Sequence, residues 1–346
     1  MQPSKLYLEP LGLLTGATAA DAVRAGVGLP FGADRAFTAA RVFRRDGERL
    51  TEELFTAATL RHPTEPQLLG ALEALARPVG QFRIMGVVNV TPDSFSDGGK
   101  WLDPDAAVRH GLSLAAAGAD ILDVGGESTR PGADPVSPDE EVGRIVDVVR
   151  SLSVAGHIVS VDTRHAKTMK AALDAGATIV NDVTALRHDP LALALVAEAG
   201  CEVILMHSQG EPRTMQVDPH YDRACLDVFD HLEERVLACE LAGIKRERIT
   251  LDPGLGFAKR AVHSLDVLQH LSLFRTLGCP VLIGASRKSM IAHVVGDDAL
   301  RPDARLPGSL AAALGGLARG ASVVRVHDVT ETRQALMVAR AIDRAP

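Results

Sequence analysis

Two loops of this chain combine glycines with hydroxyl and charged side chains, a composition typical of sites for phosphate groups and metal ions. The first follows an apolar run that ends at Asn89, and residues 91–99 add hydroxyls, two carboxylates and paired glycines. The second, residues 125–133, contains adjacent glycines, two hydroxyls and Arg130. Glycines let a backbone approach a ligand closely, whereas hydroxyls and arginine bind phosphate oxygens. We interpret the second loop as half of a diphosphate site; the alternative is a crossover turn whose arginine pairs with a neighbouring carboxylate.

Cationic side chains gather towards the C-terminal end of the sequence. Arg325 and His327 are two residues apart in an apolar run, so they share one face of the predicted strand. Burial of such a pair is costly unless an anion lies between them, although a single histidine there is more often a satisfied core residue. The preceding apolar run is followed by Arg287 and Lys288. Together with Arg130, these residues predict a ligand that carries several negative charges.

Carboxylates and an amide stand at the ends of other apolar runs, namely Asp123, Asp162, Asn181 and Asp252. A carboxylate accepts two parallel hydrogen bonds from the amino and imino groups of a pterin-like or guanine-like ring, and an amide can donate and accept in the same plane. These residues therefore predict a site for a flat polar heterocycle, with Asp162 and Asp252 as the strongest candidates. The alternative is a network of salt bridges to Lys288 or Arg325 inside the fold.

The segment of residues 252–259 predicts a flexible loop that contains one aromatic side chain, Phe257. Such a side chain could form the wall of a pocket for a second substrate with an apolar face. An isolated Phe is more often a core residue, so this residue alone is weak support for a pocket.

The hydrophobic pattern predicts the elements that position these residues. From residue 82 onward, short apolar runs alternate with segments of helical period. Each run ends at a polar residue: Asn89, Asp123, Asp162, Asn181, His207, Asp252, Ser286, and Arg325 with His327. Eight alternating units favour an α/β fold of the closed (β/α)8 TIM barrel type over a doubly wound open sheet, and the strand ends of a barrel converge on one mouth. We expect the last helix near residues 331–344, and the segment 137–140 predicts the capped start of another helix.

Residues 1–75 break this pattern with irregularly spaced glycines and a charged segment, residues 41–49, that predicts a strand and turn. Prolines at 63, 66 and 78 precede the first barrel strand. We therefore predict a small N-terminal extension domain over residues 1–75 and a barrel over residues 76–346. The extension contains no catalytic constellation, and a stabilising or oligomer-contacting role is the favoured interpretation.

Composition limits the functional class. The chain has 346 residues, is 46% hydrophobic but only 3% aromatic, and carries a formal net charge of −7, which argues against nucleic acid as a partner. Its 4 cysteines lie far apart and are expected to be reduced packing residues. The sequence contains no signal-peptide pattern and no apolar run long enough for a membrane span. We expect a soluble cytoplasmic protein without membrane partners.

Several of these motifs, taken in order, closely resemble dihydropteroate synthase. The segments are residues 89–99, 125–132, 161–163, 181–183, 252–257, 286–289 and 325–329, within a likeness that spans about residues 82–344. The resemblance implies a TIM-barrel enzyme of folate biosynthesis, a target of sulfonamides, that joins 6-hydroxymethyl-7,8-dihydropterin diphosphate to p-aminobenzoate and releases diphosphate. It also implies a dissociative reaction that uses Mg²⁺, and a homodimer. The sequence departs from the family in its long extension and at Ala258, where Gly is common.

The resemblance also implies a role for each residue of the site. The pterin ring would bind Asp162, Asn181, Asp252 and Lys288, with Asp123 close to it. The diphosphate and its Mg²⁺ would bind Asn89, Thr129, Arg325 and His327. The mobile loops that contain Asp97 and Arg130 would order around the diphosphate, while Pro131, Phe257 and Ser286 would line the p-aminobenzoate pocket. We expect the catalytic roles to fall to Arg325, His327, Lys288 and Asn89, with Asn89 as the metal ligand.

Two alternatives remain open from the sequence. A corrinoid-dependent pterin methyltransferase would share the pterin carboxylates, but it has no need for the cations of the segments 286–288 and 325–327. An inactive paralogue could bind pterin and regulate a partner through its extension. Release of diphosphate from the two substrates distinguishes the synthase from both.

Overall fold

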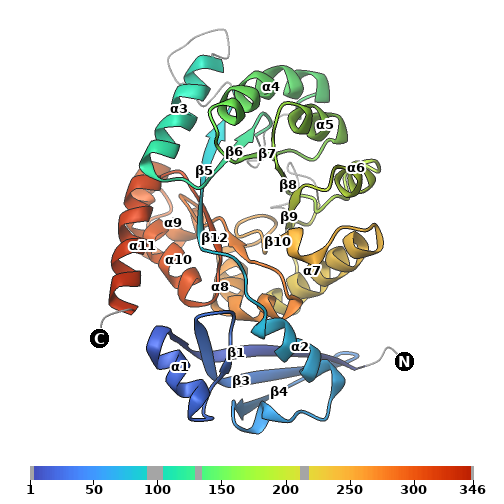
Figure 1. Ribbon diagram of the computed structural model, residues 1–346, viewed down its shortest axis with the longest axis vertical. Helices are drawn as coiled ribbons and strands as arrows, with labels where there is room; N and C mark the ends of the chain where they lie inside the picture. Colours follow the sequence, from blue (N-terminus) through green and yellow to red (C-terminus); the bar gives the residue numbers. More distant parts are fainter. Residues whose placement is uncertain (1–3, 92–103, 129–134, 211–217, 344–346) are drawn as a thin grey trace.

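The computed structural model describes residues 4–91, 104–128, 135–210 and 218–343, and its largest feature is a barrel of parallel strands (Figure 1). The eight-stranded sheet has the order β10-β9-β8-β7-β6-β5-β12-β11. Its strands are β5 (Arg83–Asn89), β6 (Ile121–Gly125), β7 (Val159–Asp162), β8 (Ile179–Asp182), β9 (Glu202–Met206), β10 (Ile249–Asp252), β11 (Leu282–Ile283) and β12 (Val323–Val326). A single parallel bridge between Leu251 and Val281 joins β10 to the β11 side. The predicted TIM barrel is confirmed.

Helices form a ring outside the strands (Figure 1). They are α3 (Pro104–Ala117), α4 (Pro138–Val154), α5 (Ala166–Asp174), α6 (Ala192–Ala199), α7 (Ala224–Leu241), α8 (Ala261–Gln269), α9 (Ser289–Val295), α10 (Leu306–Ala318) and α11 (Val329–Asp343), with 3-10 segments η3 (Arg246–Arg248), η4 (Leu271–Leu277) and η5 (Pro302–Arg305). Helix α4 begins as predicted, because Pro138 is its first residue and the Ser137 side chain accepts a hydrogen bond from the Glu140 backbone.

The barrel interior is layered, which explains how the sequence aims its polar residues. Six apolar side chains from six strands form a cluster across the interior: Met85, Ile121, Ile179, Ile204, Leu282 and Val323. Residues two positions further along a strand point to the same face. Asp123, Asn181 and Arg325 each follow a member of this cluster by two positions, so they form the next layer, nearer the mouth.

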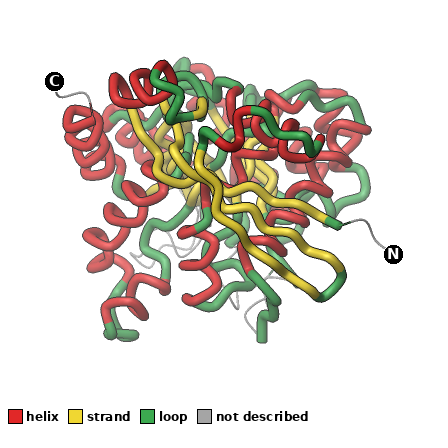
Figure 2. Tube along the Cα trace, turned by 90° about the horizontal axis from the view of Figure 1, so that it is seen from below, coloured by secondary structure: helices red, strands yellow, loops and turns green. Residues whose placement is uncertain are grey.

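The extension is an antiparallel sheet with two helices that packs beside the ring (Figures 1 and 2). Its elements are β1 (Lys5–Thr15), α1 (Gly16–Arg24), β2 (Leu29–Pro30), β3 (Arg35–Asp46), β4 (Arg49–Thr56), the 3-10 segment η1 (Thr59–Arg61) and α2 (Pro66–Ala76). The strand and turn expected over residues 41–49 belong to the β3–β4 hairpin, which turns at Gly47 with a φ of 58°.

Strands β1 and β3 of the extension sheet carry buried side chains on both faces, whereas β4 is largely exposed. Tyr7 and Phe43 are paired across β1 and β3 and join the main core of the barrel. The neighbouring pair, Leu8 and Val42, faces the other way and forms a separate core with Leu75 of α2. Alternate residues of β1 and β3 thus contact the barrel, as a strand period of two requires. No helix in the described part of the chain has the length and hydropathy to cross a membrane. The cysteines are free, and all but Cys201 are buried.

Candidate active site

Four of the predicted site residues meet around one guanidinium group at the mouth of the barrel. Arg325 on β12 donates from Nε to Asp123 Oδ2 at 2.6 Å and from Nη2 to Asp162 Oδ2 at 2.8 Å. The Asn181 amide donates to the same Asp123 oxygen at 3.1 Å. The network of salt bridges considered as an alternative is therefore present for Asp123 and Asp162. It leaves Asp123 Oδ1 buried without a hydrogen-bond partner among the described residues.

Burial and neighbouring charges shift the pKa values of this group in opposite directions. Burial raises the pKa of Asp162 to about 7, although the nearby Arg325 charge opposes the shift. Burial alone would lower the pKa of Arg325, but Asp123 and Asp162 raise it above its ordinary value. The guanidinium of Arg325 thus stays charged. The protonation of Asp162, by contrast, is sensitive to a ligand that donates a hydrogen bond to its carboxylate.

Asp252 is the last residue of β10, and Lys288 lies in the loop after β11. Asp252 is 6% exposed, and its Oδ1 accepts the backbone N–H of Gly254 at 2.8 Å. Burial raises the pKa of this carboxyl group and lowers that of Lys288 to about 8. The Lys288 Nζ lies 4.0 Å from the centre of the Phe257 ring, a cation–π contact between the loops after β10 and β11.

Ser286 and His327 form a hydrogen-bonded pair at the edge of the site. Ser286 Oγ accepts the backbone N–H of His327 at 3.2 Å and lies 3.0 Å from its Nδ1. The hydroxyl can donate to Nδ1 or accept a proton from it, so the direction of this second bond depends on the imidazole tautomer. Burial, with Arg325 next, lowers the pKa of His327 to about 3. His327 is therefore neutral near neutral pH, not the second cation expected from the sequence.

Arg287 does not join the predicted cluster of cations as a free charge. Its guanidinium pairs with the Asp328 carboxylate, with Nε 3.1 Å from Oδ2, and its backbone N–H donates to Ser309 Oγ at 2.9 Å. The residue has a φ of 60°, a left-handed conformation that directs the chain away from the preceding strand. A partly exposed ion pair of this kind anchors the loop. Of the other predicted cations that the structure describes, Arg325 is also paired, with Asp123 and Asp162, and Lys288 lies against the Phe257 ring.

Lys259 is a buried cation that the sequence analysis assigned to no role. Its Nζ lies 2.8 Å from Nδ1 of His207, the residue that follows β9, and donates to the carbonyls of Gly254 and Phe257 at 3.0 and 3.1 Å. Burial lowers its pKa to about 7. Gly254 permits this fold of the loop, since its φ is 68° and a Cβ there would lie 2.1 Å from the His207 carbonyl oxygen. In the sequence, the signal for this residue was its position at the end of the short loop that follows Asp252.

The loop after β6 is anchored by its own carboxylate. Glu127 accepts from Arg164 Nε at 3.1 Å and from Nη2 at 3.0 Å, and both side chains are 7% exposed. Glu127 is thereby committed to positioning the loop. Thr129, Arg130 and Pro131, which follow it, lie outside the described residues, as does Asp97, so their predicted roles remain predictions.

Asn89 ends β5 half-buried, at the same end of the sheet as Asp162 and Asn181. Its amide oxygen is a hard ligand of the kind that Mg²⁺ prefers. The chemistry of Asn89 therefore fits the Mg²⁺ site expected from the sequence.

A TIM barrel with carboxylates, an amide and cations at its mouth defines a class of enzyme that binds a flat heterocycle next to an anion. The family described as "Pterin binding enzyme" matches residues 85–327, more than half of the chain. The dihydropteroate synthase of Escherichia coli K12 is 44% identical over 259 residues, which cover 75% of this chain and 90% of that protein. The structure of Xanthomonas albilineans dihydropteroate synthase with 4-aminobenzoic acid has a TM-score of 0.73 at 46% identity and covers 78% of this chain and 95% of that chain.

The chain therefore belongs to the dihydropteroate synthase family, and it is a transferase of folate biosynthesis. The extension precedes the residues that the family matches. A relative in Haloferax volcanii, named a probable bifunctional folylpolyglutamate synthase/dihydropteroate synthase, is 48% identical over 263 residues, but this chain spans only 30% of its length.

Proposed function

We propose that the mouth of this barrel divides the dihydropteroate synthase reaction among three groups of residues. The pterin ring lies over Asp123, Asp162, Asn181, Asp252 and Lys288. The observation that carries this assignment is the sharing of one guanidinium by two carboxylates of adjacent strands, with Asn181 attached. Arg325 orients both carboxylates, and oxygens that it leaves open can accept the amino and imino hydrogens of the ring.

The second group binds the diphosphate. His327 offers a neutral imidazole, Lys288 and Arg325 supply positive charge, and Asn89 would hold the Mg²⁺ together with phosphate oxygens. When bound, Mg²⁺ would neutralise negative charge on the departing diphosphate. Thr129, Arg130 and Asp97 are proposed to complete this group.

Bond breaking and bond making then need no protein nucleophile. The bond between the pterin methylene carbon and the diphosphate oxygen breaks, and its electron pair leaves with the diphosphate. The amine nitrogen of p-aminobenzoate bonds to the same carbon and loses a proton. Cations at the leaving group and carboxylates around the ring stabilise the charges that develop in this step, which is electrostatic catalysis by groups already in place.

The third group holds p-aminobenzoate. Phe257 supplies an apolar wall and is itself held against Lys288, while Ser286 lies at the edge of the site through its bond to His327. Pro131 is assigned to the same pocket. We also propose that the protein acts in the cytoplasm and that it forms a homodimer. Light scattering of the purified protein tests the homodimer directly.

The reaction is tested by incubating the protein with the pterin diphosphate, p-aminobenzoate and Mg²⁺ while diphosphate and 7,8-dihydropteroate are measured. Both products should appear in equal amounts, and removal of Mg²⁺ with EDTA should stop their formation. Folded protein that binds the pterin but releases no diphosphate would instead be an inactive paralogue. Methyl transfer to a corrinoid protein, without diphosphate release, would identify the methyltransferase.

A further inference from the structure

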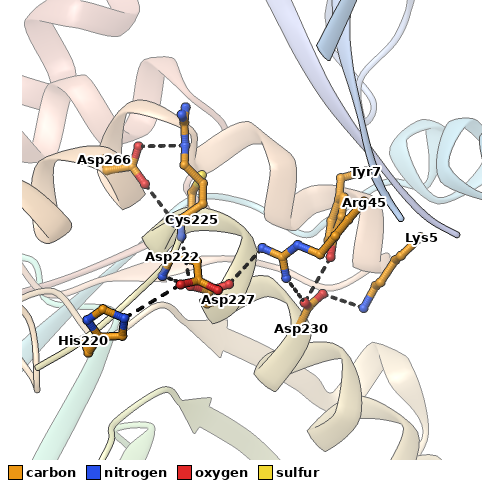
Figure 3. A network of polar contacts seen from close by, with 10 residues as sticks. Lys5, Tyr7, Arg45, His220, Asp222, Cys225, Asp227, Asp230 and Asp266 are labelled. Atoms are coloured by element: carbon orange, nitrogen blue, oxygen red, sulfur yellow. Dashed lines mark hydrogen bonds and ion pairs between the residues drawn. The ribbon is translucent and has the colours of Figure 1, made fainter. Parts of the chain in front are cut away.

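The extension contacts the barrel through charged side chains on the face of its sheet that carries Tyr7. Lys5 Nζ donates to Glu233 at 2.5 Å, and Tyr7 Oη donates to Asp230 at 3.0 Å. Arg45 donates to Asp230 and to Asp227, both at 2.9 Å. Figure 3 shows these side chains reaching from β1 and β3 to α7. These hydrogen bonds fix the orientation of the extension on α7, which the covering of an apolar surface would not require.

Asp227 connects Arg45 of the extension to the backbone immediately before α7. Its Oδ1 accepts from Arg45, whereas its Oδ2 accepts the backbone N–H groups of Asp222 and Arg223 at 2.9 and 3.1 Å. One carboxylate therefore caps the helix start and binds the extension at the same time. The position of residues 222–223 depends on a side chain that Arg45 holds in place.

A second connection reaches the same segment through a buried histidine. His270 Nδ1 lies 2.8 Å from Glu9 Oε1, and its Nε2 lies 3.1 Å from Arg223 Nη2. Arginine can only donate, so Nε2 accepts and the ring proton on Nδ1 is directed to Glu9. Glu9 and His270 are 2% and 1% exposed. Two residues of the extension thus converge on Arg223, one through its backbone and one through its side chain.

Tyr221, next to this segment, contacts the loop that carries Phe257. Its Oη donates to the Ala258 carbonyl oxygen at 2.8 Å, and its ring lies 5.8 Å from the Lys259 Nζ. Ala258 has a φ of 48°, a left-handed conformation that costs a non-glycine residue about 1 kcal/mol or more. The hydrogen bond from Tyr221 to the Ala258 carbonyl helps to hold this turn.

A metal site is the competing interpretation of this region. Cys225, Asp266 and His270 place one ligand atom each within 4.8 Å of one another. The Arg223 guanidinium lies against two of these three residues, 3.5 Å from Asp266 and 3.1 Å from His270. A fixed positive charge in that position opposes a metal cation, and Asp266 Oδ2 already accepts the Cys225 backbone N–H.

We propose that the extension positions the p-aminobenzoate loop, with Arg45 and Glu9 as positioning residues that act through residues 221–223 on residues 257–258. The inference rests on the proposed placement of Phe257 in the p-aminobenzoate pocket. It makes the extension a determinant of affinity for the second substrate, in addition to any stabilising effect. Among the described residues, the pterin residues of β6, β7 and β8 form no hydrogen bond with this set, whereas Lys288 contacts it through Phe257.

Arg45→Ala and Arg44→Ala form a matched pair for the test. The two arginines are adjacent on β3, but Arg44 faces away from the barrel and pairs with Glu65 inside the extension. In Arg45→Ala, KM for p-aminobenzoate should rise about threefold to tenfold, the effect of losing one positioning hydrogen bond, while kcat and KM for the pterin diphosphate change less than about twofold. Arg45→Lys should recover part of the loss, and Arg44→Ala should behave as wild type.

Tyr221→Phe tests the route, because it removes only the hydroxyl that holds Ala258. It should reproduce the rise in KM for p-aminobenzoate, and the double variant with Arg45→Ala should be no worse than the poorer single variant. Equal rises in KM for both substrates, or additive effects, would overturn the proposal and leave the extension a stabilising part only. Phe257→Leu checks the pocket assignment independently. Absence of product from the wild-type protein would count against the proposed function, which keeps the two failures distinct.

Discussion

The Lys288 ammonium lies 4.0 Å from the centre of the Phe257 ring, so the loops after β10 and β11 are joined by a contact between a cation and an aromatic face. The lysine is assigned to the pterin and diphosphate, and the ring to p-aminobenzoate. A contact between them places the two proposed substrate subsites side by side.

Replacement of Phe257 by leucine should weaken the second substrate more than the first. Leucine presents less apolar surface to the aromatic ring of p-aminobenzoate, and a loss of about 1–2 kcal/mol in this contact corresponds to a rise in KM for p-aminobenzoate of about fivefold to thirtyfold. Phe82→Leu is the control, because Phe82 makes a similar contact with Arg340, at 5.1 Å, in a different part of the barrel. Steady-state kinetics with each substrate varied in turn measures the effect; an equal change for Phe82→Leu would contradict it.

Arg325→Ala should destabilise the fold as well as the active site. It leaves the buried Asp123 and its neighbour Asp162 without a counter-charge, which typically costs about 3–5 kcal/mol in the free energy of unfolding. Arg287→Ala removes a partly exposed pair with Asp328 and should cost less than about 1 kcal/mol. Urea denaturation of both variants tests the difference. Similar losses would mean that the carboxylates lose their charge at little cost once Arg325 is absent.

Asp162→Asn should weaken binding of free pterin directly. The amide keeps the shape of the side chain but loses one acceptor for a charge-assisted hydrogen bond, which is worth about 1.5–3 kcal/mol, or about tenfold to a hundredfold in Kd. Arg325 retains Asp123 as a partner, so the variant should remain folded. Calorimetric titration with pterin measures Kd, and an unchanged value would remove Asp162 from the ring contact.

His327 should make the protein sensitive to acid. Its pKa in the folded state is about 3, whereas an unfolded histidine titrates near its ordinary value of 6.5. Between these values the unfolded chain binds the proton and the folded chain does not, so stability is complete above pH 6.5 and falls as the pH is lowered towards 3. His327→Asn should reduce the slope of unfolding free energy against pH by up to about 1.4 kcal/mol per pH unit in this window. An unchanged slope in His327→Asn would mean that another group causes the loss of stability in acid.

The barrel and most of its site could be predicted because strand ends and side-chain alternation are local properties. Asp123, Asn181 and Arg325 were placed correctly at one mouth, since each follows a buried apolar residue by two positions. Their mutual pairing was left open, because carboxylates at the ends of separate strands reveal neither distance nor partner. The neutrality of His327 was missed for the same reason: it depends on burial and on Arg325, not on residue type.

The extension was the least predictable part. Its charged segment indicated a strand and turn, but the direction of each arginine depends on the register of β3 against β1. Arg44 and Arg45 look alike in the sequence, yet they face opposite sides of the sheet. Lys259 is a comparable case, because a lysine at the end of a glycine-rich loop is usually solvated, and only the fold of that loop onto His207 buries it.

A single bridge, between Leu251 and Val281, joins the β10 and β11 sides of the barrel. This junction, the seam of the barrel, has the fewest paired residues of the described sheet. The connection across this seam passes through η4, and the extension packs on it: Ser272 Oγ donates to the Pro10 carbonyl at 2.9 Å. The extension thus lies against the connection between two strands that come much later in the sequence. Closure of the barrel at this junction therefore brings Ser272 and Pro10 together from distant parts of the chain.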